Sequence, residues 1–67
     1  MPSTVIKRVQ YFPEEENLQI EFVTGRIYVY KKVPKEEYAS MMNAFAKGIY
    51  FNNHIKDKYQ FEKVDAP

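Results

Sequence analysis

The alternation of apolar and polar residues in the first half of the chain predicts three β-strands. The segments are Ser3–Phe12, Leu18–Val23 and Arg26–Lys32. In Leu18–Val23, apolar and polar residues alternate regularly, which is typical of a strand with one buried face. Pro13 and the acidic residues after it indicate a loop, and Gly25 can supply the positive φ that a tight hairpin turn requires. We therefore expect an antiparallel three-stranded meander.

The first of these strands has an irregular pattern. Val9 and Tyr11 share one parity along the chain, whereas Ile6 falls on the other. A β-bulge inserts one residue into a strand and exchanges the faces of the residues that follow it. A bulge near Lys7–Arg8 would therefore bring Ile6 and Val9 onto the same face of the sheet.

The third strand is apolar on both sides, with Tyr28 and Tyr30 opposite Ile27 and Val29. One interpretation is that the tyrosine rings pack inward and keep their hydroxyl groups at the rim of the core. The other is that this aromatic pair is exposed and stacks on the bases of a single-stranded RNA. In the first case the two aliphatic residues form, with Val23, an apolar patch on the open face of the sheet. Such a patch is more often a protein contact than a nucleic-acid contact.

Beyond the third strand, the spacing of apolar residues changes from two to about 3.6, which predicts helices. The first helix runs from Pro34 to Lys47, with Gly48 just past its end as a C-terminal cap. Its apolar stripe consists of Tyr38, Met41, Met42 and Phe45. A stripe of this kind is typical of a helix that covers a core.

A second, shorter helix is predicted next, because Phe51, Ile55 and Tyr59 recur at every fourth position. The residues from Gln60 to Val64 return to alternation, so they could form a short edge strand or pack as a tail. The predicted fold class is α+β: a three-stranded antiparallel meander followed by two helices packed on one face of the sheet. At this length, residues 1–67 are expected to form a single domain.

The composition argues against several classes of function. The chain has 67 residues, no cysteine and one histidine, so it lacks the ligand set of the usual zinc sites and cannot form a disulfide. No residue stands at a spacing from His54 that indicates a catalytic triad. We therefore expect no enzymatic activity, no metal and no small-molecule cofactor. Without a long apolar run or a signal-peptide pattern, we expect a cytoplasmic protein with no membrane partner.

The order of the motifs along the chain is more specific than any one of them. GRIYVY (residues 25–30) is followed by VP (33–34) and then by AFAKGIYFNNHI (44–55). In this order the chain, from residue 3 to about 64, resembles the KTSC domain, a small module found at the C-terminus of some lysyl-tRNA synthetases and as stand-alone bacterial or phage proteins. The resemblance implies an RNA-binding module. The chain departs from the family pattern at Ala46, where serine is usual, and at Lys56, where arginine is usual. Because lysine cannot make a bidentate phosphate contact, a family phosphate site at position 56 would be weaker here.

Basic and polar residues gather in two places, although the net charge of the chain is only +1. Lysines supply charge for phosphates, amides can read base edges, and tyrosines can stack on bases. The predicted RNA-binding residues are Lys31, Lys32, Lys35, Lys47, Tyr50, Asn52, Asn53, His54, Lys56 and Tyr59, with Lys58 beside them. The alternative is that the second helix presents a solvated face and that its tyrosines cover the core.

The second functional hypothesis is a module for protein interaction or self-association that uses Val23, Ile27 and Val29. It follows from the apolar patch on the third strand, whereas the RNA hypothesis follows from the lysines. One observation separates the two hypotheses. An open sheet face that is basic and aromatic favours RNA, and one that is flat and aliphatic favours a protein partner.

Overall fold

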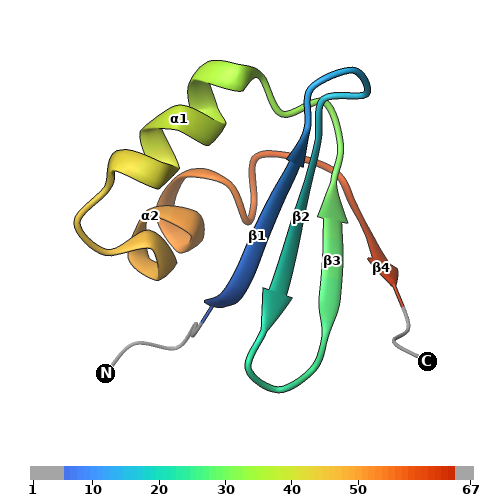
Figure 1. The fold of residues 1–67 in the computed structure, drawn as a ribbon, viewed down its shortest axis with the longest axis vertical. Coiled ribbons are helices and arrows are strands. Elements are labelled where there is room, and N and C mark those ends of the chain that lie inside the picture. Colours follow the sequence, from blue (N-terminus) through green and yellow to red (C-terminus); the bar gives the residue numbers. More distant parts are fainter. Residues whose placement is uncertain (1–5, 65–67) are drawn as a thin grey trace.

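The computed structural model describes residues 6–64, which form a four-stranded sheet and two helices (Figure 1). The strands are β1 (Ile6–Phe12), β2 (Asn17–Phe22), β3 (Ile27–Tyr30) and β4 (Phe61–Val64), and the helices are α1 (Lys35–Asn43) and α2 (Lys47–His54). All neighbouring strands are antiparallel, in the order β1-β2-β3-β4. The α+β prediction is confirmed, although the sheet has four strands rather than three, because Phe61–Val64 forms an edge strand and not a tail. Positions 3–5 of the predicted first strand lie outside the described residues.

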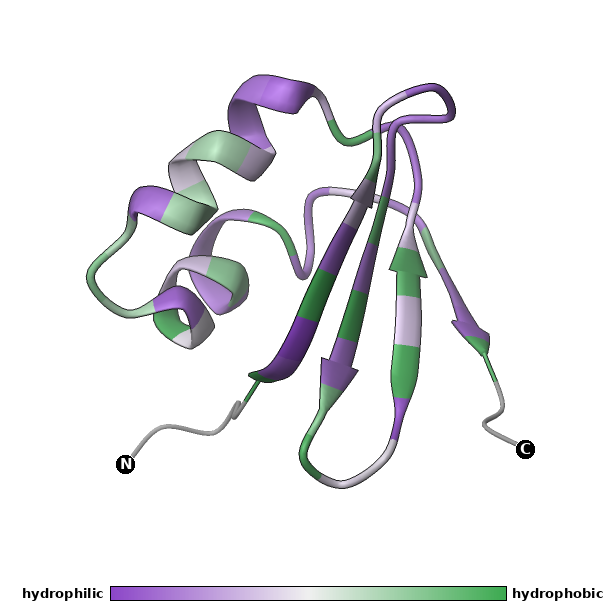
Figure 2. Cartoon of the chain, in the orientation of Figure 1, coloured by the Kyte–Doolittle hydropathy of each residue, from purple (hydrophilic) through white to green (hydrophobic). Residues whose placement is uncertain are grey.

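The predicted β-bulge is present in β1. Ile6 pairs with Phe22 and Arg8 pairs with Glu21, so Lys7 is the extra residue between them. Without the bulge, Ile6 and Val9 would lie on opposite faces; with it, both pack against the core. The alternation of apolar and polar residues along β1 and β2 is visible in Figure 2.

The core lies between one face of the sheet and the two helices. Its buried residues are Leu18, Ile20, Tyr30, Val33, Met41, Phe51 and Ile55. Directly opposed residues of antiparallel strands share a face. Leu18 therefore faces inward between Tyr11 and Tyr30, with which it pairs.

The inward interpretation of the β3 tyrosines is confirmed. Tyr30 is only 1% exposed, and its ring packs edge-on against Phe51 at a centroid distance of 5.2 Å. Tyr28 is half-buried, with Phe22 edge-on at 5.6 Å and Phe61 stacked on it at 5.2 Å. These rings are occupied by protein neighbours, so they do not form an open stacking platform for bases.

The predicted extent of the first helix is wrong at its C-terminal end. Helix α1 ends at Asn43, and Lys47, which was expected in its last turn, begins α2 instead. Gly48 consequently lies inside the second helix rather than past the end of the first. Phe45 lies between the helices and is fully exposed, although the apolar stripe predicted it to be buried. The turn at residues 44–46 folds α2 back beside α1, as Figure 1 shows.

The physical reason is that burial of the second helix outweighs the local periodicity of the first. A straight helix through Lys47 would bury Phe45 but carry the following residues past the core. Ending at Asn43 lets Phe51 and Ile55 both become fully buried. Helical segments this short are held by packing rather than by intrinsic propensity, so the better-packed arrangement wins.

The second helix is also shorter than the spacing predicts. It ends at His54, and Ile55 is its C-terminal cap. Tyr59, expected as the last member of the helical stripe, lies beyond a turn at residues 55–58. That turn leads into β4, which pairs with β3 at the edge of the sheet. Tyr59 still packs against the core, but from a loop.

Candidate nucleic-acid interface

Two segments that are far apart in the sequence line a half-open cavity at one end of β3. The cavity has a volume of about 270 Å³ and is lined by Lys31, Lys32, Lys58, Tyr59 and Gln60. The first two residues follow β3, and the other three precede β4. We call this site the corner cavity. It joins members of the two basic groups that the sequence analysis treated separately.

Backbone hydrogen bonds fix the two walls of the corner cavity. The amide of Lys31 donates to the carbonyl of Gln60 at 2.7 Å, which extends the pairing of β3 and β4 by one step. On the other side of Lys32, the amide of Val33 donates to the carbonyl of Glu16 at 2.8 Å. Lys32 lies between these two anchors and has a φ of +58°. Left-handed backbone costs a non-glycine residue about 1–2 kcal/mol, so the anchors hold Lys32 in a strained conformation.

The three lysines of the cavity differ in how far their charges are already neutralised. The ammonium group of Lys31 lies 3.4 Å from Glu62, whose side chain is 73% exposed. Lys58 lies 3.3 Å from Glu37. Lys32 makes no ion pair with any residue between 6 and 64. The cavity therefore has one unpaired cation and one that is only weakly paired, because exposed ion pairs contribute about 0–1 kcal/mol.

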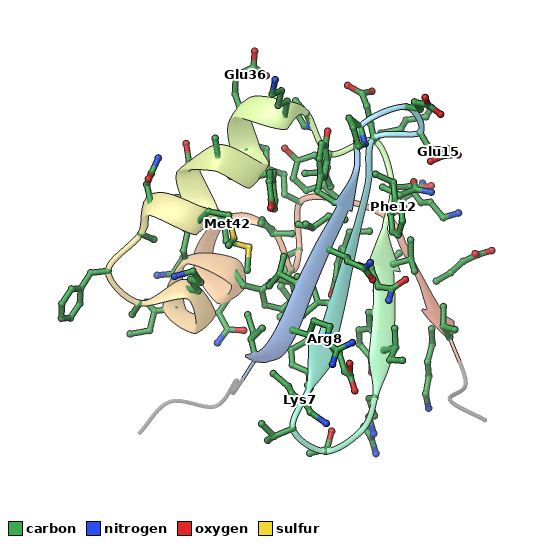
Figure 3. All side chains as sticks on the ribbon, in the orientation of Figure 1. Lys7, Arg8, Phe12, Glu15, Glu36 and Met42 are labelled. Atoms are coloured by element: carbon green, nitrogen blue, oxygen red, sulfur yellow. The ribbon has the colours of Figure 1, made fainter. Side chains whose placement is uncertain are left out.

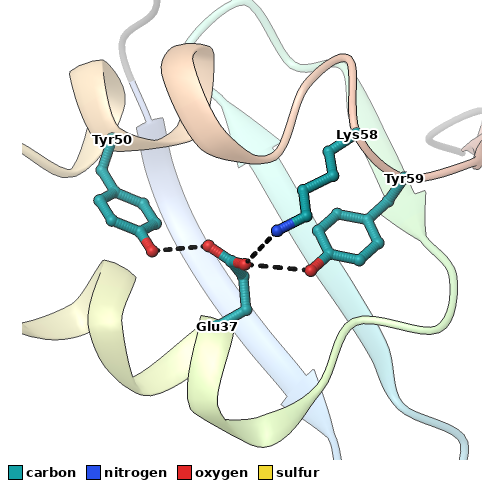
Figure 4. Close-up of polar contacts among 4 residues, drawn as sticks. All are labelled: Glu37, Tyr50, Lys58 and Tyr59. Atoms are coloured by element: carbon teal, nitrogen blue, oxygen red, sulfur yellow. Dashed lines mark hydrogen bonds and ion pairs between the residues drawn. The ribbon is translucent and has the colours of Figure 1, made fainter.

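Glu37, on the first turn of α1, connects the helices to the cavity wall (Figure 4). Its carboxylate accepts hydrogen bonds from the hydroxyl of Tyr50 at 2.6 Å and from the hydroxyl of Tyr59 at 3.0 Å. Lys58 donates to the same carboxylate. One side chain thus ties α1 to α2 and to the segment that precedes β4. The arrangement fixes Lys58 and Tyr59 where they line the cavity.

These contacts set the protonation states of the cluster. Burial alone would raise the pKa of the Glu37 carboxyl, but the hydrogen bonds from Tyr50, Tyr59 and Lys58 outweigh burial and hold the pKa below its ordinary value. The hydrogen bond to Glu37 raises the pKa of Tyr50, and burial together with the same acceptor raises the pKa of Tyr59. The pKa of Lys58 is also raised, by its hydrogen bond to Glu37. At neutral pH the cluster therefore holds a carboxylate, an ammonium group and two neutral phenols.

The polar residues predicted on the second helix do not share one face. Residues two apart on a helix point about 200° away from each other, so Asn52 and His54 lie on different sides of α2. The His54 ring packs on Tyr50 at a centroid distance of 4.4 Å. Lys47, Asn53 and Lys56 are exposed, as is Lys35 at the start of α1. None of these lysines lines the corner cavity.

The residues predicted to form a protein interface lie on or beside the sheet face away from the helices, which we call the outer face. Ile27 and Val29 are half-buried there, and Ile27 pairs with the exposed Val64 of β4. Val23 is exposed in the β2–β3 turn. Lys7 and Arg8 are exposed on β1, the edge strand away from β4 (Figure 3). Both form ion pairs with Glu21. The outer face is thus a short aliphatic strip between charged borders, neither basic and aromatic nor wholly aliphatic.

Sequence reasoning missed two residues of the site. Gln60 lines the cavity because β4 pairs with β3 in the register Tyr30–Phe61, which places Gln60 beside Lys31. Choosing the edge-strand alternative for residues 60–64 and pairing it with β3 would have indicated this position. Glu37 was interpreted only as an acidic residue at a helix start. No local pattern indicates that two distant tyrosines converge on it.

Other kinds of site are not indicated by the described structure. Within residues 6–64, no group of three or more histidine, cysteine, aspartate or glutamate side chains is arranged to hold a metal ion. No helix in this part of the chain is long and apolar enough to cross a membrane.

Comparison with known proteins places the chain among small domains of one kind. A family model described as the KTSC domain matches residues 2–59. A lysine–tRNA ligase from Nostoc punctiforme is 41% identical over 91% of this chain, and a second from Nostoc sp. is 39% identical over 88%. The chain spans only 11% and 10% of the lengths of these two ligases.

Proteins of similar length also match. An uncharacterized protein from Stutzerimonas stutzeri is 30% identical, and the match covers 97% of this chain and 93% of that protein. The crystal structure of the KTSC domain protein YPO2434 from Yersinia pestis superposes with a TM-score of 0.84 at 31% identity, covering 97% of this chain and 94% of the other. The family match, the relatives and the shared fold agree, and the chain belongs to the KTSC domain family.

Proposed function

We propose that this domain binds RNA by holding backbone phosphates at the corner cavity. The observation that carries the proposal is the convergence of Lys31, Lys32 and Lys58 from two distant segments around one cavity. Lysine ammonium groups bind phosphates as compact point charges, and each contact releases counterions from the nucleic acid. Lys32, which has no ion pair within the described residues, is the principal contact.

The family relationship supports this proposal through context. Two relatives are lysine–tRNA ligases, of which the matching segment forms about a tenth. A ligase of that name acts on a tRNA, so the domain occurs there in a protein that handles RNA. The exposed Lys35, Lys47 and Lys56 would extend the basic surface away from the cavity, with Asn53 and His54 available to bases.

The affinity for RNA is expected to be low and to depend on the salt concentration. The net charge of the chain is only +1, so long-range attraction contributes little and the local contacts carry the affinity. For a single strand, the logarithm of the association constant falls by about 0.7 per phosphate contact for each tenfold increase in salt. Two to three lysine contacts therefore predict a slope of about −1.5 to −2.

Fluorescence anisotropy with a labelled single-stranded RNA at several salt concentrations tests the proposal. Lys32→Gln is expected to weaken binding and to reduce the salt slope by about 0.7, because one phosphate contact is removed. Arg26→Gln is the matched control: it removes one positive charge at the opposite end of β3, next to the turn. Affinity that is insensitive to salt, or an equal loss in both variants, would contradict binding at the cavity.

A second candidate function is self-association through the outer face. It is favoured by the aliphatic strip of Ile27, Val29 and Val64, which the described chain does not cover completely. The β4 strand beside this strip is exposed at all its positions, and within residues 6–64 its outer edge pairs with no other strand. Open edges readily pair with another strand, so a second copy of the chain is the expected partner.

Sedimentation velocity over a wide range of protein concentration tests this second candidate. Association is expected to be concentration-dependent and to be weakened by Val29→Thr, which keeps the β-branched shape but adds a hydroxyl. Ile49→Thr, at an exposed position of α2 on the other side of the sheet, serves as a control for the loss of exposed apolar surface. A protein that stays monomeric at every concentration would leave RNA binding as the only candidate.

A further inference from the structure

We propose that the corner cavity recognises a phosphomonoester, the phosphate at the end of an RNA strand, in preference to the phosphodiesters inside it. This inference rests on the proposed function and assigns its ligand group. It follows from the charge that the cavity can offer, from the strained backbone at Lys32 and from the small size of the site.

The charge available in the cavity matches a dianion. Lys32 has no ion pair within residues 6–64, and Lys31 is paired only with the largely exposed Glu62. A ligand can recruit both ammonium groups at small cost, because an exposed pair is weak. Lys58 remains with Glu37, which is only 11% exposed. Two recruitable cations correspond to the charge of −1.5 to −2 that a phosphomonoester carries near neutral pH, whereas a diester carries only −1.

The backbone at Lys32 supports a functional role for its side chain. Glycine adopts a φ near +58° without cost, whereas lysine does not. A lysine at this position therefore costs stability that a glycine would not. Left-handed backbone at non-glycine residues is found preferentially at functional sites; Glu16, in the β1–β2 loop, shares this conformation, but of the two only Lys32 lines the corner cavity.

The size and lining of the cavity favour a compact group. A volume of about 270 Å³ lies below the usual range for drug-sized ligand sites of about 300–1,000 Å³. Gln60 adds an amide donor and Tyr59 an aromatic ring beside the lysines. The Tyr59 hydroxyl is engaged by Glu37, and Lys58 lies 5.5 Å from the centre of the ring. This lining, with two lysine cations beside an amide and an aromatic ring, suits a phosphate with its attached sugar.

The test compares three RNA oligonucleotides of one sequence: one with a 5′-phosphate, one with a 3′-phosphate and one with hydroxyl groups at both ends. Each carries its fluorophore on an internal base, so both ends stay free. At least one phosphorylated strand is expected to bind about five- to tenfold more tightly than the unphosphorylated strand in anisotropy titrations. Lys32→Gln should abolish most of this preference, and Arg26→Gln should keep it.

A second measurement separates a strand end from a free mononucleotide. Adenosine monophosphate, adenosine and inorganic phosphate are titrated into isotope-labelled protein while backbone amide signals are followed by NMR. The monophosphate is expected to shift the amides of Lys32 and Gln60, and adenosine is not. Competition by the monophosphate against the phosphorylated RNA shows whether both occupy the corner cavity.

The outcomes distinguish this inference from the proposed function. Equal binding of all three oligonucleotides overturns the phosphomonoester site and leaves RNA binding in place. If no RNA binds, both proposals are wrong, and a shift of the cavity amides by adenosine monophosphate then identifies a free mononucleotide as the ligand. If neither RNA nor monophosphate binds, both proposals are wrong. An equal loss of preference in Lys32→Gln and Arg26→Gln also overturns the site.

Discussion

Lys32 combines a strained backbone with an ammonium group that has no ion pair in the described part of the chain. Replacing it with glycine removes both features at once, with opposite consequences. Lys32→Gly should raise the free energy of unfolding by about 0.5–1 kcal/mol, because glycine accepts a φ of +58° without steric cost. The same variant should lose RNA affinity as Lys32→Gln does. Urea unfolding and anisotropy measure the two effects separately.

Lys31→Gly is the matched control for the stability gain. Lys31 precedes Lys32 but does not have a positive φ, so glycine there increases only the freedom of the unfolded chain. Its amide still donates to Gln60. Lys31→Gly should therefore destabilise the protein. If both glycine variants lose stability alike, the left-handed conformation of Lys32 is not a source of strain.

Glu37 predicts how stability depends on acid pH. Because the pKa of its carboxyl is lower in the folded protein, its contribution to stability is complete above pH 4.5 and is lost as the pH falls below 4.5 through the folded pKa. Glu37→Gln should cost about 1–2 kcal/mol at neutral pH, since an amide oxygen cannot replace all three charge-assisted contacts. The variant should also show a flatter loss of stability in acid. Thermal unfolding followed by circular dichroism from neutral pH down to acid measures both effects.

Glu36→Gln is the control for this prediction. Glu36 is the exposed neighbour of Glu37 and makes no ion pair with a described residue. Its replacement removes the same charge from the first turn of α1 but leaves the contacts with Tyr50 and Tyr59 intact. Equal effects of the two substitutions would show that helix charge, rather than the buried cluster, governs acid stability.

At the scale of single elements, the observed end of α1 predicts stability effects of substitutions that differ from those expected from the apolar stripe. The apolar stripe assigns Met41 and Phe45 equally to the core, whereas the structure buries the first and exposes the second. Met41→Ala should cost about 2–4 kcal/mol through the cavity it leaves. Phe45→Ser should change stability by no more than about 0.5 kcal/mol. Chemical denaturation of the two variants measures this, and a large cost for Phe45→Ser would place the helix end beyond Asn43.

The strands could be predicted from the sequence more fully than the helices. Alternation identified the inward residues of β2, and the one fault in the pattern located the bulge at Lys7. Two residues per period leave little ambiguity about which face is buried. The helical spacing of apolar residues in the sequence can continue past the true end of a helix by chance. Phe45 keeps this spacing although α1 ends at Asn43. Only the competition between Phe45 and Phe51 for the core decides where α1 ends, and that competition is not local.

At the scale of the whole molecule, the buried phenols predict cooperative unfolding in alkali. Burial raises the pKa of Tyr30 to about 12, with Tyr28 and Asp57 adding to the effect. The contribution of its neutral form is therefore complete below pH 10.0 and is lost as the pH rises toward 12. Tyr11, Tyr50 and Tyr59 are raised in the same direction.

Tyr30→Phe should therefore lose less stability than the unchanged protein between pH 10.0 and 12. Its core packing is retained, because the ring still meets Phe51. The measurement is denaturant unfolding at stepped alkaline pH, with phenolate absorbance recorded alongside. Parallel stability profiles for the two proteins would mean that Tyr30 ionises without opening the core.

The candidate site could be predicted only in part, because its walls come from two segments that are separated in the sequence by both helices. The sequence predicted Lys31 and Lys32 as RNA-binding residues after the third strand, with Lys58 near the second helix. What joins them is the antiparallel pairing of β3 with β4, and a four-residue edge strand has a weak sequence signal. The polar residues of α2 were grouped by sequence proximity, but helical geometry spreads Asn52 and His54 onto different sides.

The residues of the two walls of the corner cavity are synthesised at different times. Lys31 and Lys32 are synthesised before either helix, whereas Lys58 and Gln60 follow both. A domain generally folds as a unit, so the fold is completed only after this later segment has been synthesised. Until the later segment emerges, the amide of Lys31 lacks its carbonyl partner and Glu37 lacks Lys58 and Tyr59. A nascent chain therefore cannot bind through the corner cavity until residues 58–60 have been synthesised.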